Sequence, residues 1–181
     1  MKIVPCAFQL PNGEMLTVRS LCAEDAEALE VFRCATYSET HFMARYPEEG
    51  ANLEAMQKGL AGCEASALNF EVGAFAGEKL VGEFGVAQVR PHIKYRHRAV
   101  MGISVLKEAW GCGLGSFLMQ LAVAQAKANG FEQLELGVYS DNARAIHLYE
   151  KFGFERCGTM PHAFKLKDGT YRDEIMMVKM L

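Results

Sequence analysis

The chain has 181 residues, which is the length of one ordinary domain, and residues 1–181 are expected to form a single domain with its own hydrophobic core. Half of the residues are hydrophobic and 23% are charged, close to the average of globular proteins, which excludes a disordered or fibrous chain. The net charge of −3 lacks the strong basic excess of a general nucleic-acid binder, so no nucleic-acid partner is expected.

No segment of the sequence resembles a membrane span or a secretion signal. It contains no run of about 18 apolar residues, and no apolar stretch with a small-residue cleavage site follows Met1. The six cysteines are scattered, with no Cys-x-x-Cys pair, and are interpreted as reduced thiols. We therefore expect a cytoplasmic protein with no membrane partner and no metal.

One local cluster departs from the mildly acidic balance. Residues 90–98 contain three arginines, a lysine and two histidines. Two interpretations stand side by side: a solvated basic loop, or a site for an anionic ligand such as a phosphate or an acidic substrate.

The first half of the chain predicts antiparallel strands with two helices inserted after the first of them. Asn12-Gly13 between apolar runs is a hairpin signal, and apolar residues recur at helical spacing after the acidic turn at residues 24–27. The predicted elements are a short extended arm, a strand over 15–21, helices over 23–37 and 52–60, a hairpin over 69–89 that turns at 76–79, and a strand over 99–106.

The second half of the chain predicts one crossover followed by a hairpin. A helix over 114–129 stops at Gly130, and a strand over 134–138, a helix over 142–152 and strands over 155–165 and 173–179 follow. Antiparallel strands with a single β-α-β crossover predict an α+β (mixed α/β) fold with a central, mostly antiparallel sheet flanked by helices.

A glycine-rich turn joins a predicted strand to a predicted helix at Trp110-Gly111-Cys112-Gly113-Leu114-Gly115-Ser116. A helix N-terminus exposes unpaired N–H groups and partial positive charge, and glycines let an anion approach the backbone. The turn lacks the Lys of a Walker loop, and Ser116 replaces the last glycine of the dinucleotide fingerprint. Two interpretations of the turn remain: it binds a different class of phosphate ligand, or it is an ordinary tight turn.

Three motifs in a fixed order carry a family resemblance. They are Ile103-x-Val105, Gly113-x-Gly115, and Asn142-x-x-Ala145-x-x-Leu148-Tyr149-x-x-x-Gly153-Phe154. In order and separation they resemble the core of the GNAT superfamily of N-acetyltransferases, and the flanking elements follow the family order along nearly the whole chain. Trp110 departs from the pattern, because the family prefers Arg or Gln at that place.

The resemblance implies a transferase that moves an acetyl group from acetyl-coenzyme A, a cosubstrate, to a primary amine in a ternary complex. The 103–105 strand would pair with the pantetheine arm, a main-chain N–H near Leu106 would face the thioester oxygen, and the glycine turn would hold the pyrophosphate. The implied coenzyme-binding residues are Ile103, Val105, Leu106, Trp110, Gly111, Cys112, Gly113, Leu114, Gly115, Ser116, Asn142 and Tyr149.

Two side chains of the last motif are candidates for chemistry. Tyr149 follows Asn142 by seven residues, two helical turns, so both side chains lie on one face. A phenol can protonate a departing thiolate, which makes Tyr149 the candidate general acid. The alternative interpretation is structural: Asn142 caps the helix, and Tyr149 fills core volume.

The general base has several candidates. In the ribosomal-protein N-terminal acetyltransferase branch of the family, a Glu precedes the Val of the strand before the Asn helix, whereas Gly137 stands there in this chain. Glu83, an acid in an otherwise small and apolar run, is either a catalytic base that faces the substrate or an outward-facing strand residue, and His97 or a chain of waters could serve instead. Cys112 lies at the phosphate turn, too far from the thioester for a covalent acetyl-enzyme.

Two other functions are compatible with the same motifs. One is a coenzyme A binding or acyl-sensing module without turnover, and the other transfers the acyl group to a hydroxyl. The acceptor is left open among a small amine, an amino acid, an antibiotic and a protein N-terminus. The oligomeric state is open as well, although a homodimer is the commonest closed assembly.

Overall fold

The computed structural model describes residues 3–50 and 52–181. Met1 and Lys2, at the start of the segment searched for a leader, lie outside the described residues. The strands are β1 (Cys6–Gln9), β2 (Met15–Ser20), β3 (Phe70–Ala76), β4 (Lys79–Gln88), β5 (Arg98–Val105), β6 (Gln133–Tyr139), β7 (Glu155–Lys165) and β8 (Tyr171–Met180). The α-helices are α1 (Ala26–Glu39), α2 (Leu53–Ala65), α3 (Leu114–Ala128) and α4 (Ala143–Lys151).

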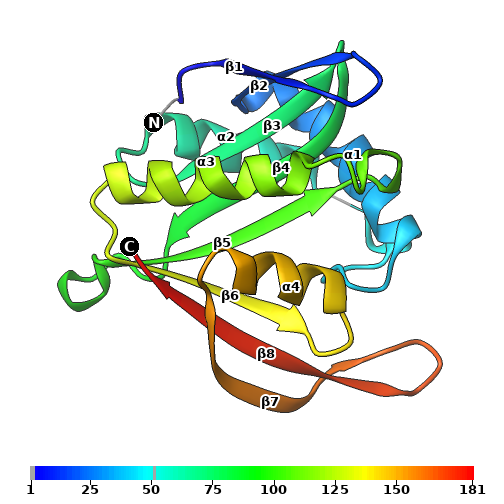
Figure 1. Cartoon of the computed structure of the whole chain (residues 1–181), viewed down its shortest axis with the longest axis vertical. Helices are drawn as coiled ribbons and strands as arrows, with labels where there is room; N and C mark the ends of the chain where they lie inside the picture. The colour runs from blue at the N-terminus through cyan, green and yellow to red at the C-terminus, as the bar shows by residue number, and fades with distance from the viewer. Residues whose placement is uncertain (1–2, 51) are drawn as a thin grey trace.

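The strands of the described residues form one sheet in the order β1-β2-β3-β4-β5-β6-β8-β7 (Figure 1). Every pair of neighbours is antiparallel except β5 and β6, which are parallel and are joined through α3. The predicted mixed α/β fold, with a mostly antiparallel sheet and one crossover, is confirmed.

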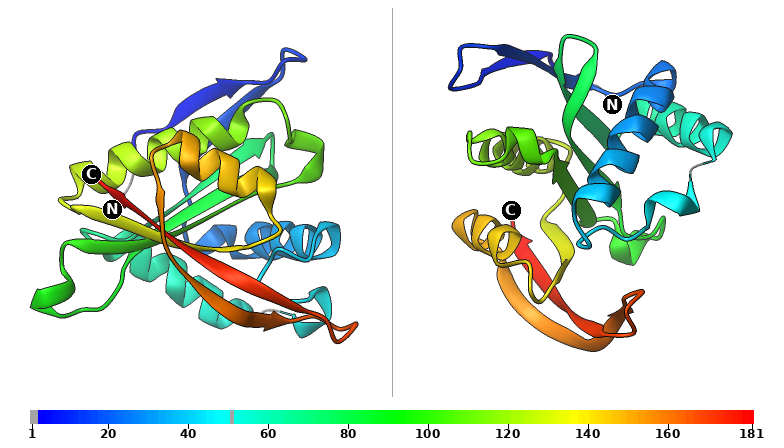
Figure 2. Two further views of the ribbon diagram at one scale, coloured as in Figure 1. Left: turned by 60° about the horizontal axis from the view of Figure 1, so that its bottom comes forward. Right: turned by 90° about the vertical axis from the view of Figure 1, so that its right-hand side faces the viewer.

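The helices cover the sheet on both faces, with α1 and α2 on one side and α3 and α4 on the other (Figure 2). Successive side chains of β4 point to opposite faces of the sheet, so this strand contacts the helices on both sides. A Cβ added to Gly82 would meet Leu114 and Leu118 of α3, whereas the next residue, Glu83, contacts Arg33 of α1. Burial of Leu114, Leu118 and the apolar face of α3 against β4 and β5 supplies much of the core.

Local signals set most of the element boundaries. Asn52 caps α2, Asn142 caps α4, and Gly130 and Gly153 take positive φ angles of 87° and 78° just after the helices end. The predicted end of the second helix at residue 60 was wrong, because α2 continues to Ala65. The helix continues through Gly62, at which an added Cβ would meet nothing within 4 Å.

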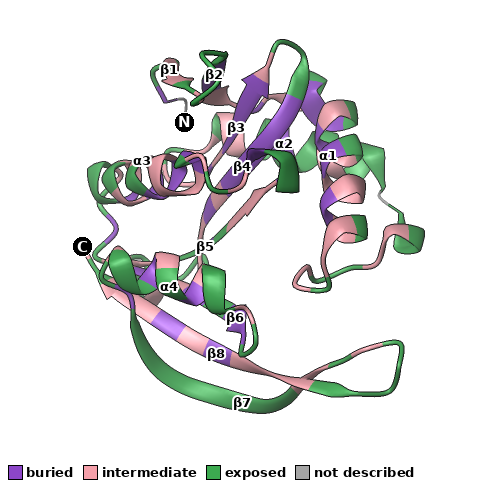
Figure 3. Cartoon of the chain, turned by 45° about the vertical axis from the view of Figure 1, so that its right-hand side comes forward, coloured by how far each residue is buried: buried purple, intermediate pink, exposed green. Residues whose placement is uncertain are grey.

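Strand β7 forms the far edge of the sheet and is exposed along most of its length (Figure 3). Its register with β8 shifts twice, between Arg156 and Gly158 and between Met160 and Phe164. The second irregularity contains Pro161 and His162, which has a positive φ of 53°.

Candidate active site

A gap opens in the sheet where β5 and β6 diverge. Their parallel register pairs only Arg98 to Val100 with Gln133 to Glu135, although β5 continues to Val105 along β4. The N–H of Leu106 donates to Val81 O of β4 at 3.0 Å. Because alternate peptide groups point to opposite edges of a strand, those of Ile103 and Val105 point away from β4, into the gap.

The glycine turn lies directly after this strand end. Gly111 and Gly113 have φ angles of 76° and 89°, which glycine adopts without strain. Gly113 caps α3, and the first helical hydrogen bond is the one that Phe117 N–H donates to Gly113 O at 3.0 Å. The N–H groups of Leu114, Gly115 and Ser116 precede that bond, so this turn has the donors and the open backbone that a phosphate needs.

Trp110 ties the turn to the strand and to α4. Its indole Nε1 donates to Val105 O at 2.7 Å, and the guanidinium of Arg144 lies 4.1 Å from the ring centroid. The Cys112 thiol donates to Ala109 O at 2.9 Å, which gives it a structural contact within the turn. The residue that departs from the family pattern is therefore part of the packing between three elements.

Helix α4 lies against the start of α3. A Cβ added to Gly115 would be 3.6 Å from Leu148, the neighbour of Tyr149. Asn142 accepts a hydrogen bond from Ala145 N at 3.2 Å, so its side chain caps the helix in this structure. Tyr149 is 7% exposed, and burial raises the pKa of its hydroxyl to about 12.

Glu83 stands on the α1 face of the sheet, beside the gap. Arg33 of α1 donates to both of its carboxylate oxygens, from Nε at 3.1 Å and from Nη2 at 3.0 Å, and Ser104 Oγ donates to Oε1 at 3.2 Å. Arg33 also reaches Glu71 at 2.5 Å. Desolvation and the nearby charge of Glu83 raise the pKa of Glu71 above its usual range. The structure thus places Glu83 in a buried ion-pair network.

Two of the main-chain donors near Leu106 are already used. Leu106 N–H bonds to Val81, and Lys107 N–H donates to Glu39 Oε2 at 2.8 Å. The N–H of Leu106 itself is therefore not the thioester-facing donor expected near this residue, because it closes the β4–β5 ladder. The N–H of Val105 is the neighbouring donor that faces the gap.

The basic segment 90–98 lies at the other end of the sheet from the glycine turn (Figure 1). His97 immediately precedes β5, six residues before Ile103, and a strand rises about 3.3 Å per residue. His97 is thus roughly 20 Å from the open strand edge along β5. Arg98 forms an ion pair with Glu135 and lies over Tyr95 at 5.4 Å. The loop therefore lies away from the gap, whether it is solvated or binds an anion.

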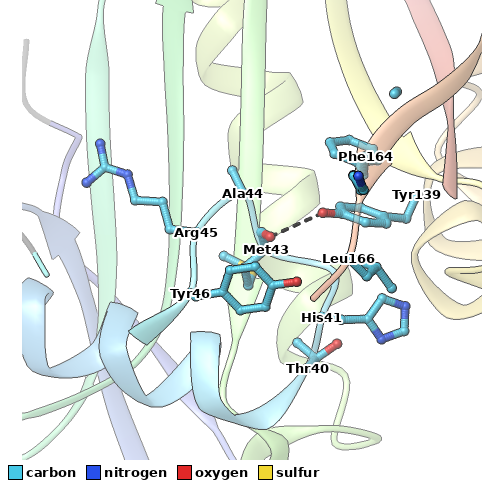
Figure 4. A pocket seen from close by; sticks show the side chains of 11 residues that line it. Thr40, His41, Met43, Ala44, Arg45, Tyr46, Tyr139, Phe164 and Leu166 are labelled. Atoms are coloured by element: carbon cyan, nitrogen blue, oxygen red, sulfur yellow. Dashed lines mark hydrogen bonds between the residues drawn. The ribbon is translucent and has the colours of Figure 1, made fainter. Parts of the chain in front are cut away.

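A pocket of about 200 Å³ opens on the α1 face, beyond the end of β6 (Figure 4). Tyr139 stacks on Phe164 of β7 with ring centroids 3.8 Å apart, and its hydroxyl donates to Met43 O at 3.3 Å. The lining comes from the loop after α1, from Tyr139 and from the β7–β8 hairpin: Thr40, His41, Met43, Ala44, Arg45, Tyr46, Tyr139, Ala163, Phe164, Lys165 and Leu166. In Figure 4 the Arg45 guanidinium points away from the Tyr139 ring.

Sequence reasoning did not identify Tyr139, Phe164 or the 40–46 loop as parts of a site. Tyr139 and Met43 are 96 residues apart, and no motif marks either of them. The partners of Glu83 were missed for the same reason, since Arg33 lies 50 residues earlier and resembles any exposed helical arginine in the sequence.

The Acetyltransferase (GNAT) family model matches residues 28–154, more than half of the chain. The chain belongs to the GNAT acetyltransferase family. The crystal structure of a GNAT-family acetyltransferase from Streptococcus pneumoniae superposes with a TM-score of 0.86 and 28% identity, over 92% of this chain and 99% of that one.

Two curated relatives are named for their acceptors. An L-methionine sulfoximine/L-methionine sulfone acetyltransferase from Pseudomonas aeruginosa is 30% identical over 90 residues, which is 50% of this chain and 52% of the relative. A mycothiol acetyltransferase from Streptomyces griseus subsp. griseus is 29% identical over 145 residues, 80% of this chain and 44% of the relative. The chain thus spans about half the length of these relatives.

Two findings concern other classes of site. In residues 3–50 and 52–181, no helix is long and apolar enough to cross a membrane. The same residues contain no group of three or more His, Cys, Asp and Glu side chains arranged to hold a metal ion.

Proposed function

We propose that this GNAT-family protein transfers the acetyl group of acetyl-coenzyme A to the primary amine of a small acceptor, by direct attack in a ternary complex. The observation that carries the proposal is the open edge of β5 at Ile103 and Val105, followed at once by the glycine turn at the N-terminus of α3. An extended amide chain that ends in a pyrophosphate fits such an edge and such a turn in sequence.

The coenzyme would be held mainly by the backbone. The peptide groups of Ile103 and Val105 face the gap, where the pantetheine amides would bind, and the N–H groups of residues 111–116 would surround the pyrophosphate. The N–H of Val105 is the proposed donor to the thioester oxygen, where it would stabilise the developing oxyanion. Asn142 contributes by fixing the start of α4, which packs against this turn.

Tyr149 is the proposed general acid. Its ring is buried in α4, and a hydroxyl with a pKa of about 12 stays protonated throughout the physiological range. A coenzyme thiolate has a lower pKa, near that of an ordinary thiol, so Tyr149 would protonate it in a slightly uphill step that release of the product completes.

Glu83 is proposed to act on the acceptor side of the gap. Because Arg33 donates to both of its oxygens, its carboxylate is fixed in position. Ser104 connects the same carboxylate to β5. This supports Glu83 as an oriented negative charge beside the incoming amine, with any proton transfer passing through Ser104 or water.

The pocket lined by Tyr139 and Phe164 is the proposed acceptor site. Its volume of about 200 Å³ suits a molecule of the size of an amino acid. The Pseudomonas aeruginosa relative is named for acceptors of this size. We therefore infer that the acceptor is a small amine, and α-amino acids are the first class to test.

Binding and turnover test the proposal separately. Acetyl-coenzyme A should raise the melting temperature, because a ligand selective for the folded state adds about 2.7 kcal/mol at 100 times Kd. Thiol release is then measured with L-methionine sulfone, other α-amino acids, simple alkylamines and a peptide N-terminus, with NAD as the binding control. Coenzyme binding without turnover of any amine would identify an acyl-sensing module, and absence of coenzyme binding would refute the proposal outright.

A further inference from the structure

The side chain of Glu174 occupies the space left by a glycine in the neighbouring strand. A Cβ built on Gly137 of β6 would lie 2.0 Å from Glu174 Oε1 and 2.7 Å from Cδ. No other residue type fits at position 137 while the carboxylate stays where it is. The carboxylate of Glu174, which comes from β8, therefore lies directly over the backbone of β6.

This carboxylate is on the acceptor face of the sheet. Glu174 is paired with Tyr139 in the β6–β8 register, and directly opposite residues point to the same face. Tyr139 lines the proposed acceptor pocket, and Gly137, two residues earlier on β6, shares its face. The carboxylate of Glu174 thus lies over Gly137, on the same face of the sheet as the Tyr139 ring that lines the pocket.

On the β5 side of the gap, the space at the level of Gly137 is empty. If the β5–β6 register continued from Arg98 and Gln133, Gly137 would be level with Gly102. A Cβ on Gly102 would have nothing within 4 Å. An acceptor that passes from the pocket to the open edge of β5 would cross this space, with Glu174 on the side of β6.

Glu174 differs from the other acidic groups around the gap in its lack of a partner. Glu83 and Glu71 are bound by Arg33, and Glu135 is bound by Arg98. Within the part of the chain that the structure describes, the side chain of Glu174 makes no hydrogen bond or ion pair. Burial is the main cause that raises the pKa of Tyr139, and the charge of Glu174 adds to it after those of Tyr46 and Asp141. The nearest cationic residue on its own face of β8, Arg172, is bonded to Asp141.

We propose that Glu174 receives the ammonium group of the acceptor and removes its proton. This inference rests on the proposed acetyl transfer and identifies its proton acceptor. The ammonium gives one proton to Glu174, which passes it to solvent, and the neutral nitrogen forms a C–N bond to the thioester carbonyl carbon. The C–S bond breaks, the thiolate takes up a proton from Tyr149, which solvent reprotonates, and the nitrogen gives its second proton to water as the amide forms. The first transfer is uphill, and amide formation draws it forward.

Two substitutions test the role of Glu174, one by removing its charge and the other by displacing its carboxylate. Glu174→Gln removes the charge, whereas Gly137→Ala keeps the charge and forces the carboxylate away, because the new Cβ takes its place. Both variants should lose about 10²-fold or more in kcat/KM for the best amine of the acceptor panel. The thermal shift with acetyl-coenzyme A should be unchanged in both. Glu155→Gln, an exposed strand glutamate on β7, is the matched control and should have wild-type kinetics.

The double variant and the pH profile separate proton transfer from packing. Gly137→Ala combined with Glu174→Gln should be no slower than the slower single variant, because both changes remove the same interaction. The acid limb of the kcat/KM profile should differ between the wild type and Glu174→Gln, because only the wild type has a carboxylate at this position. The titratable neighbours to be considered are Tyr139 and Asp141 on the β6 side and His41 in the pocket wall.

The results that overturn the inference are distinct from those that overturn the enzyme. Wild-type kcat/KM in a folded Glu174→Gln protein with an unchanged acid limb would eliminate Glu174 as the proton acceptor. If Gly137→Ala does not fold, the Glu174→Gln kinetics and pH profile decide alone. If the wild type acetylates no amine of the panel, the proposed function fails, whatever the Glu174 variant does.

Discussion

The indole nitrogen of Trp110 lies 2.7 Å from the carbonyl oxygen of Val105, to which it donates a hydrogen bond. This bond links the end of β5 to the start of the glycine turn, five residues later. This carbonyl points into the gap, and the indole bond occupies it. The backbone groups that stay open toward the gap are the N–H of Val105 and the N–H and C=O of Ile103. Trp110 therefore fixes the shape of the proposed coenzyme site.

Replacing Trp110 by Phe removes the donor and keeps an aromatic ring for Arg144. We expect the free energy of unfolding to fall by about 1 kcal/mol, the usual net value of one hydrogen bond. The Kd for acetyl-coenzyme A should rise, since the strand end and the turn are no longer held together. Urea unfolding and calorimetry check the two effects. Arg144→Gln, which keeps the indole bond, is the control; if both variants bind equally well, the bond has no role in coenzyme binding.

Gly115→Ala tests whether the glycine is required for stability or for coenzyme binding. An added Cβ makes only an ordinary contact with Leu148 at 3.6 Å, and alanine favours helix, so the melting temperature should stay or rise. If phosphate oxygens approach this backbone, the Kd for acetyl-coenzyme A should rise by about 10-fold or more, which corresponds to roughly 1.4 kcal/mol. Gly59→Ala, at an open position on α2, should leave the Kd unchanged. Equal affinities in the two variants would make the turn structural only.

Tyr149→Phe tests the proposed acid. The turnover number should fall by about 10²- to 10⁴-fold with little change in coenzyme affinity, because the ring and its packing remain. Weaker coenzyme binding with normal turnover would instead assign the hydroxyl to binding. If the variant keeps wild-type turnover when chemistry is shown to be rate-limiting, Tyr149 is not the acid, and solvent protonates the thiolate.

Burial of Tyr149 also makes stability depend on alkaline pH. Its pKa is raised from 10 to about 12 in the folded state, so the folded form favours the neutral phenol. The contribution is fully present below pH 10 and is lost as the pH rises toward about 12. Urea unfolding at a series of alkaline pH values should show this decline in the wild type and a smaller one in Tyr149→Phe. An identical decline in both would show that other groups cause it.

The Arg33 network predicts a second dependence on pH, of the same sign. Because the pKa of Glu71 is raised in the folded protein, its contribution is present below the ordinary carboxyl pKa and is lost as the pH rises through the raised value. Glu71→Gln should flatten this part of the stability profile. Glu83→Gln removes the like charge that helps to raise the pKa of Glu71, so the decline should move to lower pH. The exposed Glu54→Gln is the control, and a profile unaffected by Glu71→Gln would contradict the assignment.

The sequence predicted those parts of the molecule that depend on neighbours along the chain. Asn12-Gly13 marked the first hairpin, Gly130 and Gly153 marked helix ends, and the glycine turn was expected to begin a helix, as Gly113 does. These signals act through local backbone preferences. They were sufficient for the element order and the mixed fold.

Contacts between distant residues could not be predicted from these signals. An isolated Glu83 in a strand suggested a free base, whereas the fold pairs it with Arg33 in a buried network. Which N–H near Leu106 faces the gap also depended on strand pairing, because the partner strand bonds that of Leu106 and leaves that of Val105. The position of Glu174 over Gly137 depends on the pairing of two strands that are far apart in the sequence, and on a side-chain direction that no composition or periodicity encodes.

The broken register of β7 has a consequence for how the protein behaves in a concentrated solution. An exposed edge strand presents unpaired N–H and C=O groups, to which a strand of another molecule can add, and repeated addition leads to aggregates. In β7 the two shifts, Pro161 and the positive φ of His162 interrupt the regular spacing of those groups. A long foreign strand therefore finds no continuous ladder to extend, and the widest exposed edge of the sheet is protected against open-ended self-association by its own irregularity.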